Sequence, residues 1–483
     1  MFRLILYMEL REIIGSKKFA FTFGICSILI ITAFFSGIKN YQAGLTEYNA
    51  SKAAGLQKLE TVTDWAEVND HQVFLPPSPL AYLIMGVSND LPRTANINGS
   101  ASPALSDSIY SEKPVYAVFR FLDLEFVFQI VLSLFAILFA FNAVNGEREN
   151  GTLKLVFSNA LPRAVYILGK LAGSFLALAL PLLLPVFTGL LLLPLTGINL
   201  SSDEWIRLML FILCGLLYLG VFLTLSVFMS CLTRRSSSSF LFLLVIWTFF
   251  VLIVPRASVL MAGHMVEVPS SAEISFRLAR LGRQQSIDME KKINEYMNRE
   301  QKNGFGSSPE DLERRQKKIN EFCEILNSES KREEQELAGR LNEERRNRQA
   351  GQEKLAFGIS RISPAAVFSL AATELGGTSI GLKHHFQKMA AAYSKSFAEF
   401  IREKTGRSIG GQMNIAVSSN FSLDEKSGQV QRIDPAEIPE FVYRPPELSG
   451  ILHRASPDIA ILLLFNLIFF CGAFLAFLRF DLH

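Results

Sequence analysis

Six long apolar runs constrain the fold of this chain more than any other feature of its sequence. A helix needs about 20 mainly apolar residues to cross the roughly 30 Å hydrocarbon core of a bilayer, and each run meets that length. The runs cover residues 19–38, 123–144, 165–195, 207–231, 238–257 and 457–478. We therefore predict an all-α polytopic membrane protein with six transmembrane helices.

The third run and the N-terminus each add a local feature. Residues 165–195 contain Pro181, Pro185 and Pro194, and because proline removes a backbone donor and clashes with the preceding turn, we predict a kinked or broken helix. Residues 1–18 read as an amphipathic elbow helix that lies in the membrane interface. Its apolar residues Leu4, Ile5, Met8, Leu10 and Ile13 alternate with the polar residues Arg3, Glu9, Arg11 and Glu12.

Lysine and arginine near the ends of the runs predict the orientation, because cytoplasmic loops carry an excess of these residues. If the six helices alternate in direction, the basic residues fall on one side. They are Arg3, Arg11, Lys17, Lys18, Arg148, Lys154, Arg163, Lys170, Arg234, Arg235 and Arg479. We therefore predict that both termini and residues 145–164 are cytoplasmic.

Two large regions then lie outside, at residues 39–118 and 258–456. Within the second, residues 272–354 are rich in Arg, Lys, Glu and Gln, with apolar residues at three- to four-residue steps. The stretch "NGFGSSPEDLE" divides them: Gly304 and Gly306 end one helix, and Ser308 with Pro309 begins the next. We predict an antiparallel helical hairpin of the coiled-coil kind. It is either a solvated spacer or a lever that contacts a periplasmic partner.

The sequence does not contain the motifs of common enzyme and metal sites. It has no GxxxxGK[ST] phosphate loop, no HExxH and no Gly-x-Ser-x-Gly. Its five cysteines form no CxxC pair, and the adjacent His384 and His385 would point about 100° apart on a helix, a poor arrangement for two metal ligands. The net charge of +3 does not suggest nucleic-acid binding. We predict no catalytic residues and no metal site.

Ionisable residues are also missing from deep within the six runs. Asp123, Glu125 and Arg207 lie near the ends. Ion-coupled transporters and proton pumps usually place such residues inside the membrane. A transporter without them would take its energy from a separate ATPase, which the predicted cytoplasmic segment 145–164 could contact.

That segment carries a recognisable motif. Residues 145–170 read "NGERENGTLKLVFSNALPRAVYILGK", which resembles the segment after the second span in the membrane subunits of type-2 ABC exporters, the ABC-2 family. The matching positions are Gly146, Glu147, Arg148, Glu149, Gly151, Thr152, Leu153, Ser158, Pro162, Arg163, Gly169 and Lys170. The rest of the layout resembles a bacterial subgroup with a large extracytoplasmic domain before the last transmembrane helix.

The resemblance implies that residues 145–164 form a coupling helix that docks on a nucleotide-binding subunit. The implied coupling residues are Glu147, Arg148, Glu149, Gly151, Thr152, Leu153, Leu155, Val156, Phe157, Pro162 and Arg163. On this interpretation the charged residues contact the ATPase electrostatically, and the four apolar residues from Leu153 to Phe157 insert into a groove on it.

The resemblance also implies the cofactors, partners and location. The chain itself would bind no cofactor, with ATP and Mg on the partner ATPase. Its partners would be that ATPase, a second permease copy or a related permease, and membrane lipid, with no nucleic acid; if the outer hairpin is a lever, a periplasmic protein is a further partner. It would lie in the bacterial inner membrane as a permease of an ABC exporter. Two alternatives stay open: a mechanotransmitter acting through the outer hairpin, and a membrane-anchored scaffold or sensor.

Overall fold

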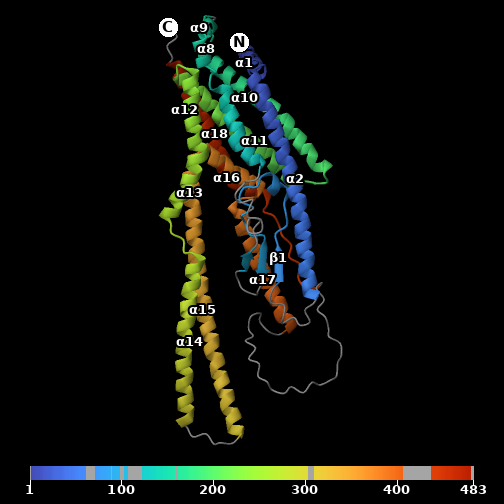
Figure 1. Cartoon of the computed structure of the whole chain (residues 1–483), viewed down its shortest axis with the longest axis vertical. Coiled ribbons are helices and arrows are strands. Elements are labelled where there is room, and N and C mark those ends of the chain that lie inside the picture. Colours follow the sequence, from blue (N-terminus) through green and yellow to red (C-terminus); the bar gives the residue numbers. More distant parts are fainter. Residues whose placement is uncertain are drawn as a thin grey trace. The chain divides into compact units, whose positions relative to one another are not determined.

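The computed structural model describes residues 2–60, 71–88, 90–97, 103–106, 122–158, 161–302, 309–405 and 437–479. These residues divide into two compact units, which are described separately. Unit 1 comprises Met1–Ile253 and Arg361–His483, and unit 2 comprises Val254–Ser360 (Figure 1).

Helices account for most of both units. The first half of unit 1 contains α1 (Phe2–Ile14), α2 (Lys17–Glu60), α3 (Pro79–Leu83), α6 (Leu124–Phe126), the π-helical segment η2 (Val127–Leu132), α7 (Ser133–Ala140), α8 (Asn145–Glu149), α9 (Thr152–Phe157) and α10 (Arg163–Leu195). The remainder of unit 1 contains α11 (Ser202–Leu232), α12 (Ser236–Thr248), the π-helical η3 (Phe249–Ile253), α16 (Pro364–Gly376), α17 (Ile380–Thr405) and α18 (Leu448–Leu478). Unit 2 contains α13 (Val254–Met265), α14 (Ser271–Lys302) and α15 (Pro309–Ser360).

The predicted all-α polytopic membrane fold is confirmed. Among the described residues, seven helical stretches are long and apolar enough to cross a membrane, and six of them overlap the six predicted runs. The seventh, Pro364–Lys404, has a mean hydropathy of 1.2, against at least 2.1 in each of the others. It is interrupted where α16 ends at Gly377, which has a left-handed φ of 69°. The count of six transmembrane helices stays a prediction.

Two helices differ from their predicted form. α2 continues to Glu60 instead of ending at residue 38, and its 44 residues correspond to about 66 Å, roughly twice the hydrocarbon thickness. α10 runs from Arg163 to Leu195 without interruption, although Pro181, Pro185 and Pro194 lie inside it. Of the predicted kinked or broken helix, the broken form is therefore wrong. Thirty-three residues of strongly apolar sequence, packed on both α1 and α2, keep the helix continuous in spite of the lost backbone donors.

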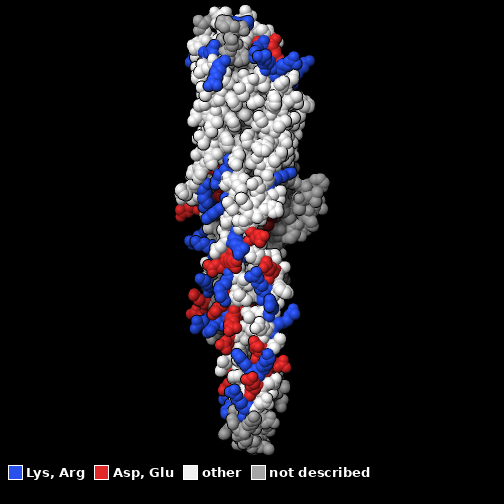
Figure 2. Space-filling view, turned by 90° about the vertical axis from the view of Figure 1, so that its left-hand side faces the viewer, with Lys and Arg blue, Asp and Glu red and all other residues white. Residues whose placement is uncertain are grey.

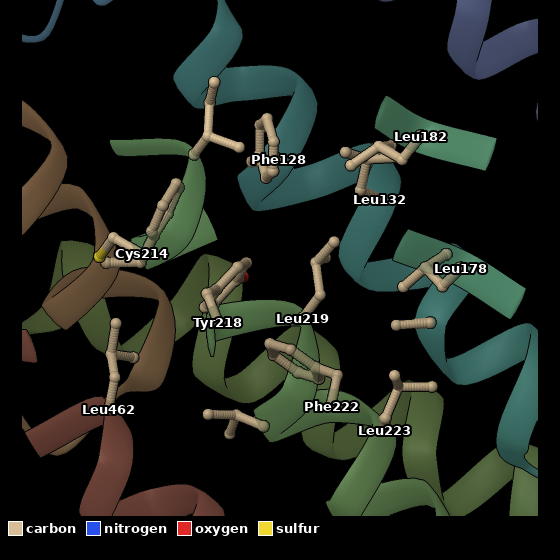
Figure 3. Close-up of a cluster of buried hydrophobic side chains, with 14 of the residues drawn as sticks. Phe128, Leu132, Leu178, Leu182, Cys214, Tyr218, Leu219, Phe222, Leu223 and Leu462 are labelled. Carbon is tan, nitrogen blue, oxygen red and sulfur yellow. The ribbon is translucent and has the colours of Figure 1, made fainter. Parts of the chain in front are cut away.

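The core of unit 1 is centred on α11, which packs against α18, α16, α7 and α10. Figure 3 shows Tyr218 and Phe222 of α11 among side chains from η2, α10 and α18. Phe368 of α16 is fully buried in the same core and stacks on Tyr218, with 4.7 Å between ring centroids. On the face shown in Figure 2, unit 1 has a band without charged side chains. Lys and Arg residues lie above this band, at the end where Figure 1 places α1, α8 and α9.

A small sheet and α17 form a second apolar cluster. β1 (His71–Phe74), β2 (Thr94–Ile97) and β3 (Ala104–Ser106) pair antiparallel in the order β1-β2-β3. Val73, Ala95 and Ile97 of the sheet pack with Phe386 and Phe397 of α17. His71 lies at the edge of this cluster, with its Nε2 atom 3.0 Å from the hydroxyl of Tyr393.

The burial of His71 predicts a pH-dependent stability. Burial lowers the pKa of this imidazole from 6.5 to about 4 in the folded state. As the pH falls below 6.5, the unfolded chain takes up the proton first, so stability is lost between pH 6.5 and 4, by at most about 3 kcal/mol. Thermal unfolding of the chain and of His71→Gln at pH 7 and pH 4.5 tests this. The loss of stability between pH 7 and pH 4.5 should be smaller in His71→Gln than in the unaltered chain, and equal losses would contradict the expectation.

Unit 2 is built from two long helices that lie side by side (Figure 1). The rings of Tyr296 on α14 and Phe322 on α15 stack with centroids 4.4 Å apart, and Gln285 Nε2 donates to Glu333 Oε2 at 3.0 Å. Lys, Arg, Asp and Glu are intermixed along their surface (Figure 2). α15 begins at Pro309, while the predicted helix ends at Gly304 and Gly306 and the cap at Ser308 lie outside the described residues.

Candidate functional site

The segment between α7 and α10 is two short helices, whereas one helix was predicted over residues 145–164. α8 ends at Glu149 and α9 begins at Thr152. Between them Gly151 has a φ of 70°, a left-handed conformation that residues with a Cβ atom rarely adopt. The glycine of the recognised motif therefore turns the chain and sets α9 in a new direction.

α8 is fixed by hydrogen bonds to the end of α11, the start of α12 and the turn between them. Ser230 Oγ accepts from the backbone nitrogens of Val144 and Asn145, both at 3.0 Å, and so satisfies donors at the start of α8. The Asn145 amide donates to Thr233 Oγ1 at 3.0 Å. Glu149 accepts from the backbone nitrogen and the hydroxyl of Ser236, at 3.0 and 2.6 Å. Because Ser236 begins α12, the carboxylate also complements the positive end of that helix.

A buried ionic cluster joins α8 to α1 and α10. Lys170 Nζ lies 2.6 Å from Glu9 Oε2 and 2.5 Å from Glu147 Oε1, and its side chain is 6% exposed. Tyr166 donates to Glu147 Oε2 at 2.7 Å, and Ser174 donates to Glu9 Oε1 at 3.1 Å. Burial raises the pKa of Glu9, although the charge of Lys170 opposes that shift. Two carboxylates thus share one ammonium group and two hydroxyl donors; Glu9 and Lys170 are buried, and Glu147 is 23% exposed.

Glu9 corrects one part of the sequence analysis. It was placed with the polar residues of an interfacial helix, but it is 5% exposed and faces α10, while Leu4 and Met8 of the same helix are each 62% exposed. Two glycines of α10 allow α1 to come this close. A Cβ atom on Gly169 would lie 2.8 Å from Ile5 Cγ2, and one on Gly173 would lie 2.7 Å from Glu9 Cβ, so α1 packs directly on the backbone of α10.

The apolar residues of α9 do not share one exposed face. Leu153 is 3% exposed in the core, so it cannot insert into a partner as predicted. Phe157 packs on Tyr166 and Phe477, with centroids 5.3 and 5.7 Å apart, and Val156 is half-buried. Only Leu155 of the four is exposed, at 69%.

The end of the segment connects to α18. Pro162 is the N-cap of α10 and has the extended conformation that proline favours. Arg163 Nη1 donates to the carbonyl oxygens of Leu478 at 2.6 Å and Phe477 at 3.4 Å. These carbonyls lie at the C-terminal end of α18, where the helix dipole is negative, so a cation there is favourable. Arg148 is half-buried, and Thr152 Oγ1 donates to the carbonyl of Glu147 at 3.1 Å.

The structure therefore brings most of the predicted coupling residues together at one end of unit 1, but it gives many of them partners within the chain. Residues that sequence reasoning missed complete the site: Glu9, Tyr166, Ser174, Ser230 and Ser236. Glu9 was visible in the sequence as a polar residue of residues 1–18, but nothing in the pattern distinguished it from Arg3, Arg11 and Glu12. The serines carried no comparable signal.

The two histidines considered as metal ligands are not gathered with other ligand types. His385 Nε2 donates to the carbonyl of Arg444 at 2.7 Å. Within the described ranges, no group of three or more His, Cys, Asp or Glu side chains is placed to hold a metal ion.

Comparison with protein-family models gives a match. The model of a family described as "ABC-2 family transporter protein" matches residues 3–394, most of the chain. A search of curated proteins finds no match.

Proposed function

The chain belongs to the ABC-2 family of transporter proteins, and from this we propose that it is the permease subunit of an ATP-driven exporter that couples to a separate ATPase through α8 and α9. The chain itself would not be an enzyme: ATP and Mg would bind to the ATPase. Two permeases, identical or related, would enclose the pathway, in an inner membrane with α1, α8 and α9 on the cytoplasmic side.

The coupling proposal rests on one observation. A strip of exposed residues in and next to α9 lies on residues that pack against the rest of unit 1. The strip consists of Gly151, Thr152, Lys154, Leu155 and Ser158, all exposed. Beneath it, Leu153 is buried and Phe157 packs on α10 and α18. A protruding leucine beside a lysine is suited to an anchor in an apolar pocket with an acidic rim.

The ion pairs and hydrogen bonds that link α8 and α10 to neighbouring helices would transmit a movement of the ATPase to the rest of unit 1. Glu147 ties α8 to Lys170 of α10, and Lys170 ties α10 to Glu9 of α1. Glu149 ties α8 to α12, and Arg163 ties α10 to α18. A displacement of α9 by the ATPase would therefore move the ends of four long helices together, since well-packed junctions transmit strain.

The exposed leucine provides the sharpest test. We expect Leu155→Glu to reduce the amount of P-loop ATPase that co-purifies with the tagged, detergent-solubilised chain by about tenfold or more, because a charge would enter the centre of the interface. The matched control is Leu56→Glu, the same substitution at an exposed leucine near the far end of α2. The measurement is quantitative mass spectrometry of the co-purified chains.

The comparison of three samples decides between the interpretations. ATPase recovered with the unaltered chain and with Leu56→Glu, but not with Leu155→Glu, supports the coupling surface. Equal recovery with Leu155→Glu would remove this surface from consideration. Absence of any ATPase from the unaltered chain, under conditions that preserve other ABC complexes, would favour the membrane-anchored scaffold.

A further inference from the structure

A cavity of about 80 Å³ lies in unit 1, at the end of α11 that is opposite to α8 and α9. A cavity of this size has room for several water molecules or one compact polar group. Arg207, which lines it, precedes Ser230 by 23 residues, about 35 Å along the helix. With α8 and α9 on the cytoplasmic side, the cavity is on the external side. Nothing in the proposed coupling function requires it.

Arg207 is the central charge of this cavity. Its side chain is 8% exposed, and its Nε atom donates to the carbonyl of Leu375 at 2.7 Å. No carboxylate in the described part of the chain lies within ion-pair distance of it. The nearby Glu204 is engaged at the N-cap of α11, where it accepts from the Ser201 backbone nitrogen at 2.9 Å. A buried guanidinium is costly unless hydrogen bonds or an opposite charge compensate it, so an anion in the cavity would stabilise Arg207.

The backbone makes room for this guanidinium. Gly377 has a left-handed φ of 69°, and a Cβ atom there would lie 2.6 Å from Arg207 Nη2. Any side chain at this position would therefore displace the arginine. Ser379 and Gly381, at the first turn of α17, also line the cavity, so the positive end of that helix is close.

Two further arginines line the same cavity. Arg454 Nε lies 2.9 Å from Glu374 Oε2, and Arg93 Nη1 donates to the hydroxyl of Tyr82 at 2.7 Å. Three guanidinium groups and one carboxylate line the cavity, and Asp203 and Glu204 in the first turn of α11 also act electrostatically on Arg207. The other walls are largely apolar and include Pro76, Pro446 and Leu382.

From this arrangement we propose that the cavity binds a phosphate-type oxyanion on the external side of the membrane. Guanidinium forks match the oxygens of such an anion, and the apolar walls would contact whatever group carries it. The source is either the headgroup of an anionic lipid or free phosphate, and both supply the same chemistry to Arg207.

The test uses the full-length chain in phosphate-free detergent solution. Two probes are titrated by calorimetry: inorganic phosphate, and a short-chain phosphatidylglycerol below its micelle concentration. We expect binding of at least one probe, weakened about tenfold or more in Arg207→Gln, since a hydrogen bond to a charged group is lost. Arg454→Gln, at a half-exposed position less important for folding, should weaken the same probe. Arg402→Gln, an exposed charge near the far end of α17, is the matched control and should bind normally.

The two probes separate the sources. Binding of phosphate alone, with the same dependence on Arg207, identifies a free-oxyanion site, and binding of phosphatidylglycerol alone identifies a lipid site. The proposal is overturned if the unaltered chain binds neither probe. It is also overturned if binding survives in both Arg207→Gln and Arg454→Gln.

Discussion

Replacing Lys170 with methionine should destabilise the folded chain by about 3–5 kcal/mol, because it leaves the buried carboxylate of Glu9 and the partly exposed carboxylate of Glu147 without their cation. Glu9 and Lys170 have side chains that are 5% and 6% exposed, so water cannot take the place of the ammonium group. Methionine has a similar length, which limits the contribution of a cavity to the loss. The measurement is the free energy of unfolding in detergent, or the shift in Tm that corresponds to it.

A compensated variant distinguishes the charge from the packing. Glu9→Gln and Glu147→Gln combined with Lys170→Met remove the whole ionic cluster while keeping its approximate volume. Because a buried ion cluster contributes little net stability when replaced as a unit, we expect the triple variant to recover most of the loss. A loss below about 1 kcal/mol in Lys170→Met alone would mean that the cluster is hydrated and does not hold α1 against α10.

The second large effect is expected at Phe368. Truncation to alanine should cost about 3–5 kcal/mol, the usual range for a fully buried phenylalanine. Phe368 is 0% exposed and contacts the rings of Phe128, Phe211 and Tyr218. The substitution would therefore loosen α16 from α11 and η2 at once.

An exposed phenylalanine gives the control for this truncation. Phe187 of α10 is 63% exposed in unit 1, so Phe187→Ala removes the same atoms without opening a cavity. We expect its Tm to stay close to that of the unaltered chain. If the two variants lost equal stability, α16 would not be part of the core, and its packing against the membrane-spanning helices would be wrong.

The sequence predicted the long helices well, because about 20 consecutive apolar residues have few alternatives to a membrane helix. It could not place α16. Residues 364–376 are short and moderately apolar, and only tertiary contacts with Phe128 and Tyr218 reveal that they belong to the core. The continuity of α10 through three prolines was missed for a similar reason, since the neighbouring helices decide whether a proline breaks a helix.

The sequence predicted where the candidate site lies, but not which of its residues are exposed and which contact one another. The motif located residues 145–170, and the structure places α8, α9 and the start of α10 at one end of unit 1. Pattern alone could not tell which motif residues face outwards. Glu147 is engaged by Lys170 and Tyr166, whereas Leu155 is exposed. Lys170 also pairs with Glu9, which is more than 130 residues from Glu147 along the chain, and no local periodicity encodes such a pairing.

The π-helical segment η2 fixes the rotation of the helix that precedes α7. A π turn holds one residue more than an α turn, and each residue corresponds to about 100° of rotation. Upstream of η2, Asp123 accepts from the Met85 backbone nitrogen at 2.9 Å, and Glu125 accepts from Ser369. Deleting one residue between 127 and 132 would restore a regular helix and swing both acidic side chains away from these partners. A homologue that is one residue shorter in this stretch would therefore have to satisfy the outer end of the helix with a different set of polar residues.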